Sequence, residues 1–345
     1  MPKSSILMSI TLCFFSLAAR GEDWISYGVQ DDPGAGKHVV LLAGDEEYRS
    51  EEGLPMLAKI LSQRHGFKCS VLFSVDGDGT IHPNVQTSLS GAQQLDSADA
   101  IVMALRFRNW PDETMKHFVD AYQRGIPIIG LRTSTHAFSY PDDRETSYRE
   151  YNSFGERVLG EKWVSHWGRH KREATLGVFE PSAENEPILS GVANIFGDTD
   201  VYEAYPPQDA KILVRGRVLT GMNPDDPPAD YTKRRNTDRQ SQGVNDPMMP
   251  VAWTRLHTNE SGKTNRVFCT TMGSATDLKS EGLRRLIVNA VYWGLEMDIP
   301  QRADVRFIDD YHPTMYGFDG YRRGIRPEDH ALGKVLPAGD GSGSD

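Results

Sequence analysis

The chain has very little cysteine. It holds 3 cysteines in 345 residues, and one of them, Cys13, lies in the apolar segment near the N-terminus. The remaining pair, Cys69 and Cys269, cannot build a disulfide scaffold. Both stand in apolar, strand-like stretches, where we expect small buried side chains, with a single bridge as the alternative. No Cys-x-x-Cys pair or Cys/His cluster suggests structural zinc.

The chain also has fewer basic than acidic residues. The 38 Lys and Arg residues stand against 48 Asp and Glu, which gives a formal net charge of −10. An acidic surface repels nucleic acid and anionic membranes, so neither is an expected partner. The phosphate-binding patterns GxGxxG and GxxxxGK[ST] are absent, and we expect no cofactor. A small or neutral ligand suits this composition best.

An apolar run opens the chain, from Ile6 to Leu17 after Lys3, and small residues follow it at Ala18 and Ala19. This pattern predicts a secretory signal peptide over residues 1–20 and a secreted or periplasmic protein. The run is shorter than the roughly twenty residues that a membrane-spanning helix needs. We therefore expect no membrane span once the leader is removed, with a retained anchor as the alternative.

From residue 38 the pattern becomes that of an α/β domain. Continuous apolar runs predict buried strands over residues 38–44, 68–74, 99–105 and 126–131. Amphipathic spacing predicts helices over residues 51–66 and 111–125. The order strand, helix, strand, strand, helix, strand predicts a doubly wound parallel sheet.

The second half is less regular. Strands are expected over residues 174–180, 211–219, 251–256 and 266–272, with one clear helix over residues 280–295. Residues 221–247, rich in Pro, Asn and Asp, look like a long surface insertion. We expect a single domain over residues 37–300 with loop insertions, then a polar C-terminal extension over 301–345 whose end is disordered.

Polar side chains follow three of the predicted strands. Because ligands bind at the carboxyl edge of open α/β sheets, these side chains are expected to converge on one cleft. The candidates are Asp45, Glu46, Glu47 and Tyr48 after the first strand, Arg106 and Arg108 after the third, and Arg132, Thr133, Thr135 and His136 after the fourth. Thr276, in the loop before the last helix, would add another polar wall.

These residues also have structural alternatives. Glu46 and Glu47 could be solvated acids at a helix start, where the helix dipole favours them. Arg106 and Arg108 alternate, so only one is expected to face a pocket while the other forms a surface ion pair. A loop-holding ion pair would explain an arginine at position 132 equally well.

A second group of candidates lies in "WVSHWGRHKR". His166 and His170 are four residues apart and would share a metal-binding face if helical. Gly168 favours a loop instead, and no glutamate follows His166, so we expect no metal there. The nearby aromatic residues could stack against a sugar or could pack in the core; they are Trp163, Trp167, Tyr202 and Tyr205.

The stretches "LLAGDEEYRSEEGLP", "PIIGLRTSTHAF", "GERVLGEKWVSHWGRH", "NDPMMPVAWTR" and "RVFCTTMGSATD" together resemble the ThuA-like, or trehalose-utilisation-like, family. The resemblance covers about residues 37–300. It implies a flavodoxin-like sheet of the class I glutamine amidotransferase type and a role in sugar metabolism.

In an amidotransferase the turn after this strand reads roughly P-x-x-G-x-C-x-G, with the cysteine as nucleophile. Laid over Pro127 and Gly130, that cysteine position falls on Arg132. A guanidinium is protonated and cannot attack an amide, so glutamine amidotransfer is excluded. Many ThuA-like sequences carry a histidine at this turn, and this chain departs from them. An arginine there would present a positive fork to a carboxylate, an oxyanion or sugar hydroxyls.

We therefore expect a carbohydrate enzyme that hydrolyses or isomerises an oxidised (keto) disaccharide. His136, or a histidine of residues 165–170, would be the acid or base, with Glu47 as its carboxylate partner and Arg132 stabilising negative charge. Two alternatives stay open: a non-catalytic carbohydrate-binding protein, and a metal-dependent hydrolase built on His166 and His170. An oligomer is possible.

Overall fold

The computed structural model describes residues 23–28 and 36–336. The predicted signal peptide, residues 1–20, and the expected disordered end, residues 337–345, lie outside the described residues. Within the described ranges, no helix is long and apolar enough to cross a membrane.

A 10-stranded sheet forms the centre, in the order β1-β3-β2-β4-β5-β14-β13-β10-β7-β8. Its parallel strands are β3 (Lys68–Phe73), β2 (His38–Gly44), β4 (Ala100–Leu105), β5 (Ile128–Leu131) and β14 (Thr264–Thr270). Antiparallel strands extend both sides: β1 (Trp24–Tyr27) beside β3, and then β13 (Met249–Thr258), β10 (Lys211–Val218), β7 (Thr175–Phe179) and β8 (Phe196–Gly197) beyond β14.

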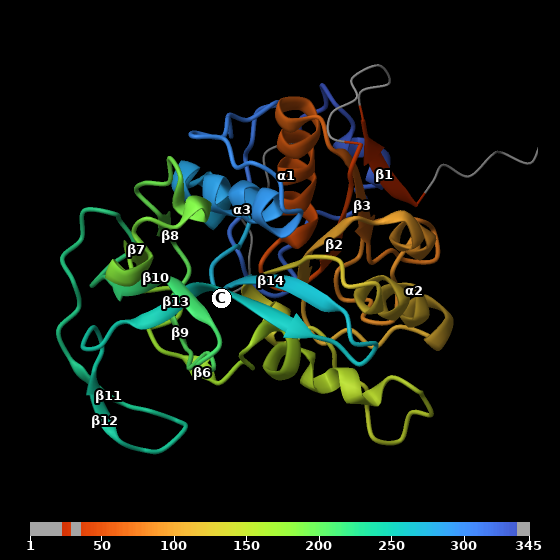
Figure 1. The fold of residues 1–345 in the computed structure, drawn as a ribbon. Coiled ribbons are helices and arrows are strands. Elements are labelled where there is room, and N and C mark those ends of the chain that lie inside the picture. Colours follow the sequence, from red (N-terminus) through yellow and green to blue (C-terminus); the bar gives the residue numbers. More distant parts are fainter. Residues whose placement is uncertain (1–22, 29–35, 337–345) are drawn as a thin grey trace, which may run out of the picture.

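Helices cover both faces of this sheet. α1 (Ser50–His65) and α3 (Glu281–Gly294) pack their apolar side chains on one face, and α2 (Asp112–Gln123) packs on the other (Figure 1). Because both faces are covered, every residue of β2 and β4 is buried, which explains their continuous apolar sequences. The predicted single α/β domain with a doubly wound sheet is confirmed.

Helix α1 shows how local sequence sets the element boundaries. The chain enters it through Arg49 in a left-handed conformation (φ 59°) and leaves through Gly66, also left-handed (φ 69°). The Gly66 N–H bonds the carbonyl groups of Leu61 and Ser62, which closes the last turn. This stop was the one expected from the glycine at that position.

The antiparallel half carries short additional strands. β11 (Thr232–Arg234) pairs with β12 (Ser241–Gly243) within the predicted surface insertion, and this ribbon projects from the body (Figure 1). β6 (Ser165–His166) pairs with β9 (Tyr202–Glu203) near the carboxyl edge of the parallel strands. Both Cys69 and Cys269 are buried and unpaired, so no bridge joins them.

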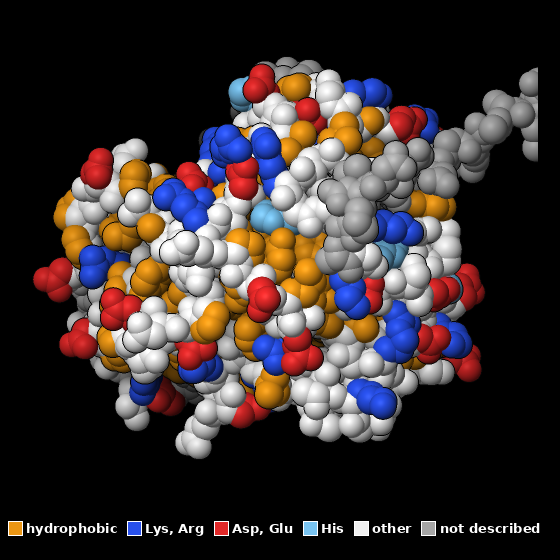
Figure 2. All heavy atoms as spheres, turned by 45° about the horizontal axis from the view of Figure 1, so that its top comes forward, with side chains coloured by type: hydrophobic (Ala, Val, Ile, Leu, Met, Phe, Trp, Pro, Cys, Tyr) orange, Lys and Arg blue, Asp and Glu red, His pale blue; other side chains and the backbone are white. Residues whose placement is uncertain are grey.

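The C-terminal segment belongs to the same body. Lys59 of α1 forms an ion pair with Asp309, and Arg322 lies 3.0 Å from the Glu52 carboxylate, also on α1. Residues 301–336 therefore pack back onto the domain. On the face drawn in Figure 2, basic and acidic side chains are interspersed rather than gathered by sign.

Candidate functional site

The carboxyl ends of β2, β4 and β5 meet at one edge of the sheet because these strands are parallel neighbours. At the end of β5 the chain turns sharply into a short 3-10 helix over Arg132–His136. Arg132 takes a left-handed conformation there, with φ 44°, which costs a non-glycine residue about 1–3 kcal/mol. The site is thus built around a strained turn that surrounding contacts must hold.

Those contacts engage the Arg132 guanidinium almost completely. Nη1 donates to the backbone carbonyls of Asp200 and Thr271, each at 2.7 Å. Nη2 donates to Asp200 Oδ1 at 3.1 Å and to the Tyr48 hydroxyl at 3.2 Å. The guanidinium carbon also lies 4.6 Å from the centre of the Tyr48 ring and 3.7 Å from that of Tyr202.

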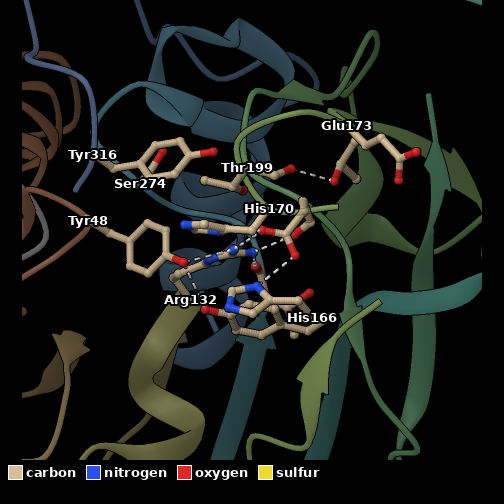
Figure 3. A network of polar contacts seen from close by, with 12 residues as sticks. Tyr48, Arg132, His166, His170, Glu173, Thr199, Ser274 and Tyr316 are labelled. Carbon is tan, nitrogen blue, oxygen red and sulfur yellow. Dashed lines mark hydrogen bonds and ion pairs between the residues drawn. The ribbon is translucent and has the colours of Figure 1, made fainter. Parts of the chain in front are cut away.

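Arg132 is 1% exposed, so its charge faces the protein interior rather than an open cleft. The sequence suggested that the Arg132 guanidinium would bind a ligand, but in the structure this group binds Asp200. Arg132 therefore fixes the Asp200 carboxylate through an ion pair at 3.1 Å and supplies a buried positive charge. Figure 3 shows Arg132 from close by, among Tyr48, His166 and His170.

Asp200 is the residue that joins the site together, and sequence reasoning missed it. Its Oδ2 accepts a hydrogen bond from His166 Nδ1 at 2.8 Å, and its Oδ1 accepts one from His170 Nδ1 at 3.0 Å. Burial alone would raise the pKa of Asp200, but the hydrogen bonds from His166 and His170 and the Arg132 charge outweigh it and hold this pKa well below its usual range.

The pairing of β6 with β9 explains how Asp200 reaches the two histidines. His166 lies opposite Tyr202 in this ribbon, which brings the chain just before β9 alongside residues 165–170. Asp200 follows no strand of the parallel sheet, and it lies 34 positions from His166 in the sequence. The segment "GDTDVYEAY" carried no spacing signal for this role; its concentration of acidic and tyrosine residues was the only available hint.

His170 lies between two carboxylates. Besides the bond to Asp200, its Nε2 is 3.2 Å from Glu47 Oε1. Burial lowers the pKa of His170, but the hydrogen bonds to Asp200 and Glu47 raise it more, to about 9. The ring is therefore an imidazolium at neutral pH.

Glu47 is ionised for the reciprocal reason. Burial favours its neutral form, but the His170 hydrogen bond and the charges of His170, Arg106 and Arg132 leave its pKa lowered. Glu47 is buried, which departs from the picture of a solvated acid at a helix start. The histidine beside Glu47 is His170, and the role of Glu47 as partner of a catalytic histidine stays a prediction.

His166 has one nitrogen free. Its Nδ1–H is directed at Asp200, its side chain is 36% exposed, and no group in the described part of the chain bonds Nε2. An imidazole that donates from Nδ1 to a carboxylate keeps the Nε2 lone pair available as a base. This is the arrangement of an oriented general base facing the open side of the site.

His136, the other candidate base, lies at the rim without such a partner. Its Nδ1 is 3.3 Å from the Thr135 hydroxyl, and its ring contacts Phe107 and Trp163 with centres 4.9 and 5.6 Å apart. Burial and the nearby positive charge of Arg106 lower its pKa to about 3, so the ring is neutral. Within residues 23–28 and 36–336, no carboxylate bonds this ring.

Glu46 forms a buried charge cluster with both arginines after β4. Its carboxylate lies 2.9 Å from Arg108 and 3.5 Å from Arg106. The expected alternation fails because Phe107 adopts a left-handed conformation (φ 52°), which turns both guanidinium groups towards Glu46. Arg108 is fully buried, so the expected surface ion pair is replaced by an interior one.

Asp45 and Thr133 hold two strand ends together. Asp45 Oδ1 accepts from the backbone N–H groups of Glu47 (2.7 Å) and Tyr48 (2.9 Å), and Oδ2 accepts from the Thr133 hydroxyl. Burial and the neighbouring Glu46 charge raise the pKa of Asp45. These contacts position Glu47 and Tyr48.

Three other residues predicted for the site, Trp167, Thr135 and Thr276, do not face His166 Nε2. Trp167 is fully buried and donates from Nε1 to the Val244 carbonyl at 2.8 Å, and Thr135 is buried in the 3-10 helix. Thr276 donates to Asp198 Oδ1 at 2.6 Å, two residues from Asp200 along the chain. None of these three presents an open polar group to the His166 nitrogen.

His166, His170 and Asp200 offer ligand atoms within 4.8 Å of one another, close enough to hold a metal ion. Both ring nitrogens of His170 are hydrogen-bonded, however, and Asp200 already pairs with Arg132. The positive charges of Arg132 and His170 balance the negative charges of Asp200 and Glu47. Because these charges already neutralise one another, the arrangement favours proton transfer over metal binding.

Comparison with known proteins places this chain in a family. The family model for trehalose utilisation, ThuA, matches residues 38–294. The chain belongs to the ThuA family. This membership suggests a carbohydrate-related role, and a search of curated proteins finds no match.

Solved structures similar to this ThuA-family chain include two ThuA-like proteins. The one from Parabacteroides merdae has 13% identity and a TM-score of 0.48, and the alignment covers 82% of this chain and 97% of that one. The one from Bacteroides uniformis has 13% identity and a TM-score of 0.46, with 76% and 92% covered.

The ThuA match ends at residue 294, before a segment that reaches the site. The Tyr316 ring stacks on Tyr48 with centres 5.2 Å apart and lies 5.5 Å from the His170 ring (Figure 3). The Gly317 N–H donates to the Glu47 carbonyl at 2.8 Å. The C-terminal extension therefore closes one side of the site, which its polar composition did not indicate.

Proposed function

We propose that the protein is an enzyme acting on an oxidised (keto) disaccharide, in which His166 removes the proton on the carbon beside the ketone. The observation that carries this proposal is the His166–Asp200 pair at 2.8 Å with the opposite ring nitrogen open. The family's carbohydrate context supports the substrate class. The N-terminal pattern predicts that the reaction takes place outside the cytoplasm.

The chemistry balances with groups already present. The proton passes from carbon to His166 Nε2, and the electron pair of the C–H bond moves into the carbonyl to form an enolate. The glycosidic C–O bond at the next carbon then breaks, its electron pair leaves with the oxygen, and protonated His166 returns the proton to that oxygen. Addition of water to the resulting double bond completes hydrolysis. An isomer forms instead if the proton of the adjacent hydroxyl moves to the enolate oxygen and protonated His166 returns its proton to the former carbonyl carbon.

The surrounding charges suit the enolate. His170 is a permanent imidazolium because it lies between Asp200 and Glu47, and Arg106 adds a second positive charge near the rim. Both favour negative charge developing within a partly buried site. Arg132 acts through Asp200 as a positioning residue, because its guanidinium is buried.

The first step can be tested without knowing the final product. Trehalose oxidised to a ketone at one ring carbon is incubated with the protein in D₂O, and loss of the proton signal beside the ketone is followed by NMR. His166→Gln should slow this exchange by about 10²–10⁴-fold, the usual contribution of a general base. His117→Gln, which removes a histidine bonded to Asp96 on α2's side of the molecule, is the matched control and should leave the rate unchanged.

Three outcomes would contradict the proposal. Unchanged exchange in His166→Gln would remove the assigned base. Stoichiometric binding of the keto-sugar with no exchange in the wild type would favour a non-catalytic carbohydrate-binding protein. Exchange abolished by chelation and restored by zinc would favour the metal-dependent alternative on His166, His170 and Asp200.

A further inference from the structure

A ring of side chains, joined by contacts and at one place by the chain itself, includes His170, whose Nε2 lies 3.2 Å from Glu47 Oε1. On one side Trp163 contacts both His136 and His166, with ring centres 5.6 and 5.8 Å apart. His136 continues to Phe107 with centres 4.9 Å apart. These contacts connect the loop before β6 to the ends of β4 and β5.

The ring continues through Arg106 to the C-terminal segment. The Arg106 guanidinium lies 4.6 Å from the centre of the Phe107 ring and 5.0 Å from that of Phe318, between the two. Tyr316, two residues before Phe318, contacts His170 and so returns the ring to the catalytic histidines. The rim therefore alternates apolar ring faces with charged or hydrogen-bonding groups.

Two members of this ring are conspicuously open to solvent. Trp163 is 39% exposed and Phe318 is 51% exposed, whereas Tyr48, Tyr202 and Tyr316 are buried. An aromatic ring left in water does not contribute the folding free energy that its burial would provide. Exposed aromatic side chains beside a polar site are typical of a binding surface.

We propose that Trp163 and Phe318 form the two walls of a disaccharide-binding cradle, each stacking on the apolar C–H face of one pyranose ring. This inference rests on the proposed function and extends it to the residues that select the substrate. A pyranose offers an apolar face to an aromatic ring and hydroxyl groups at its edge, which matches a rim of this mixed character. Glu47, Arg106 and His136 supply partners for those hydroxyls.

The Phe318 wall is preorganised by hydrogen bonds of its two neighbours in the chain, Gly317 and Asp319. The Gly317 N–H is bonded to the Glu47 carbonyl at 2.8 Å, and the Asp319 carboxylate accepts from Asn84 Nδ2 at 2.7 Å. A wall fixed on both sides of Phe318 loses little conformational freedom on binding. Because Phe318 lies beyond the residues matched by the family model, it distinguishes this protein's cradle from a site built on residues 38–294 alone.

The test measures binding separately from turnover. Isothermal titration calorimetry with trehalose and with its ketone derivative is carried out on the full chain and on Trp163→Ala and Phe318→Ala. Each variant should bind both disaccharides about tenfold more weakly, which corresponds to loss of one stacking contact of about 1.4 kcal/mol. Phe318→Tyr should restore binding, because it keeps the ring face.

Leu256→Ala is the matched control, since Leu256 is an exposed apolar side chain (57%) on β13 that lies outside the ring. It should bind as the wild type does. Unfolding midpoints that stay within error of the wild type show that the aromatic variants remain folded.

The two proposals fail differently. His166→Gln should bind the disaccharides normally yet lose proton exchange. If this variant retains exchange while Phe318→Ala binds more weakly, the catalytic assignment is wrong and the cradle is supported. Binding by both aromatic variants within twofold of the wild type would overturn the cradle. So would the absence of binding of either disaccharide by the wild type at millimolar concentration.

Discussion

The position of the half-buried His170 between Asp200 and Glu47 predicts an unusual dependence of stability on pH. Those carboxylates raise the pKa of His170 to about 9, while a histidine in an unfolded chain titrates near 6.5. Because the folded-state pKa is raised, the protonated ring stabilises the fold fully below about pH 6.5. That contribution is lost as the pH rises through about 9.

The size of the effect follows from the difference between the two pKa values. A rise from about 6.5 to about 9 corresponds to about 3 kcal/mol in the free energy of unfolding. The His170 side chain is 27% exposed, so solvent screening reduces this to about 2 kcal/mol. We therefore expect the wild type to lose about 2 kcal/mol of stability between pH 6.5 and pH 9 from this residue.

Urea denaturation at a series of pH values measures this change directly. His170→Gln should remove the decline between pH 6.5 and 9 that the wild type shows. His257→Gln is the matched control: burial lowers the pKa of His257, so any contribution of that ring falls below pH 6.5. Equal slopes in the wild type and His170→Gln would show that His170 is not held as an imidazolium, and the charge balance argued for the site would be wrong.

Three further results are expected. Burial and, to a lesser extent, the neighbouring Asp277 charge raise the pKa of Asp198 to about 7. Asp198→Asn should therefore increase the free energy of unfolding at pH 8 and leave it nearly unchanged at pH 4, as urea titrations would measure. Arg132→Met should cost about 3–5 kcal/mol by leaving the Asp200 charge buried and unpaired, and equal stability would refute the assigned role. A Cβ on Gly155 would lie 1.9 Å from the Thr135 carbonyl, so Gly155→Ala should lower the melting temperature by several degrees at least, which calorimetry would detect.

The sequence determined the architecture because its signals are local. Continuous apolar runs such as residues 38–44 and 100–105 require cover on both faces, and the spacing of Leu54, Leu57 and Leu61 requires a helix against a sheet. Parallel strands place their carboxyl ends at one edge, so the gathering of residues 45–48, 106–108 and 132–136 could also be predicted. The arginine at the nucleophile position predicts the absence of amidotransfer without any coordinates.

Only the tertiary structure decided which charged groups pair. Arg132 bonds Asp200, which is 68 positions away in the sequence and reaches it just before β9 of the β6–β9 ribbon. That choice gives His166 rather than His136 a carboxylate partner, which is why we propose His166 as the base. The packing of Tyr316 on Tyr48 adds a segment that composition assigned to a polar extension. The physical reason is that a buried charge pairs with an opposite charge on whichever loop packs against it. The path of a loop depends on long-range packing, which local sequence periodicity does not predict.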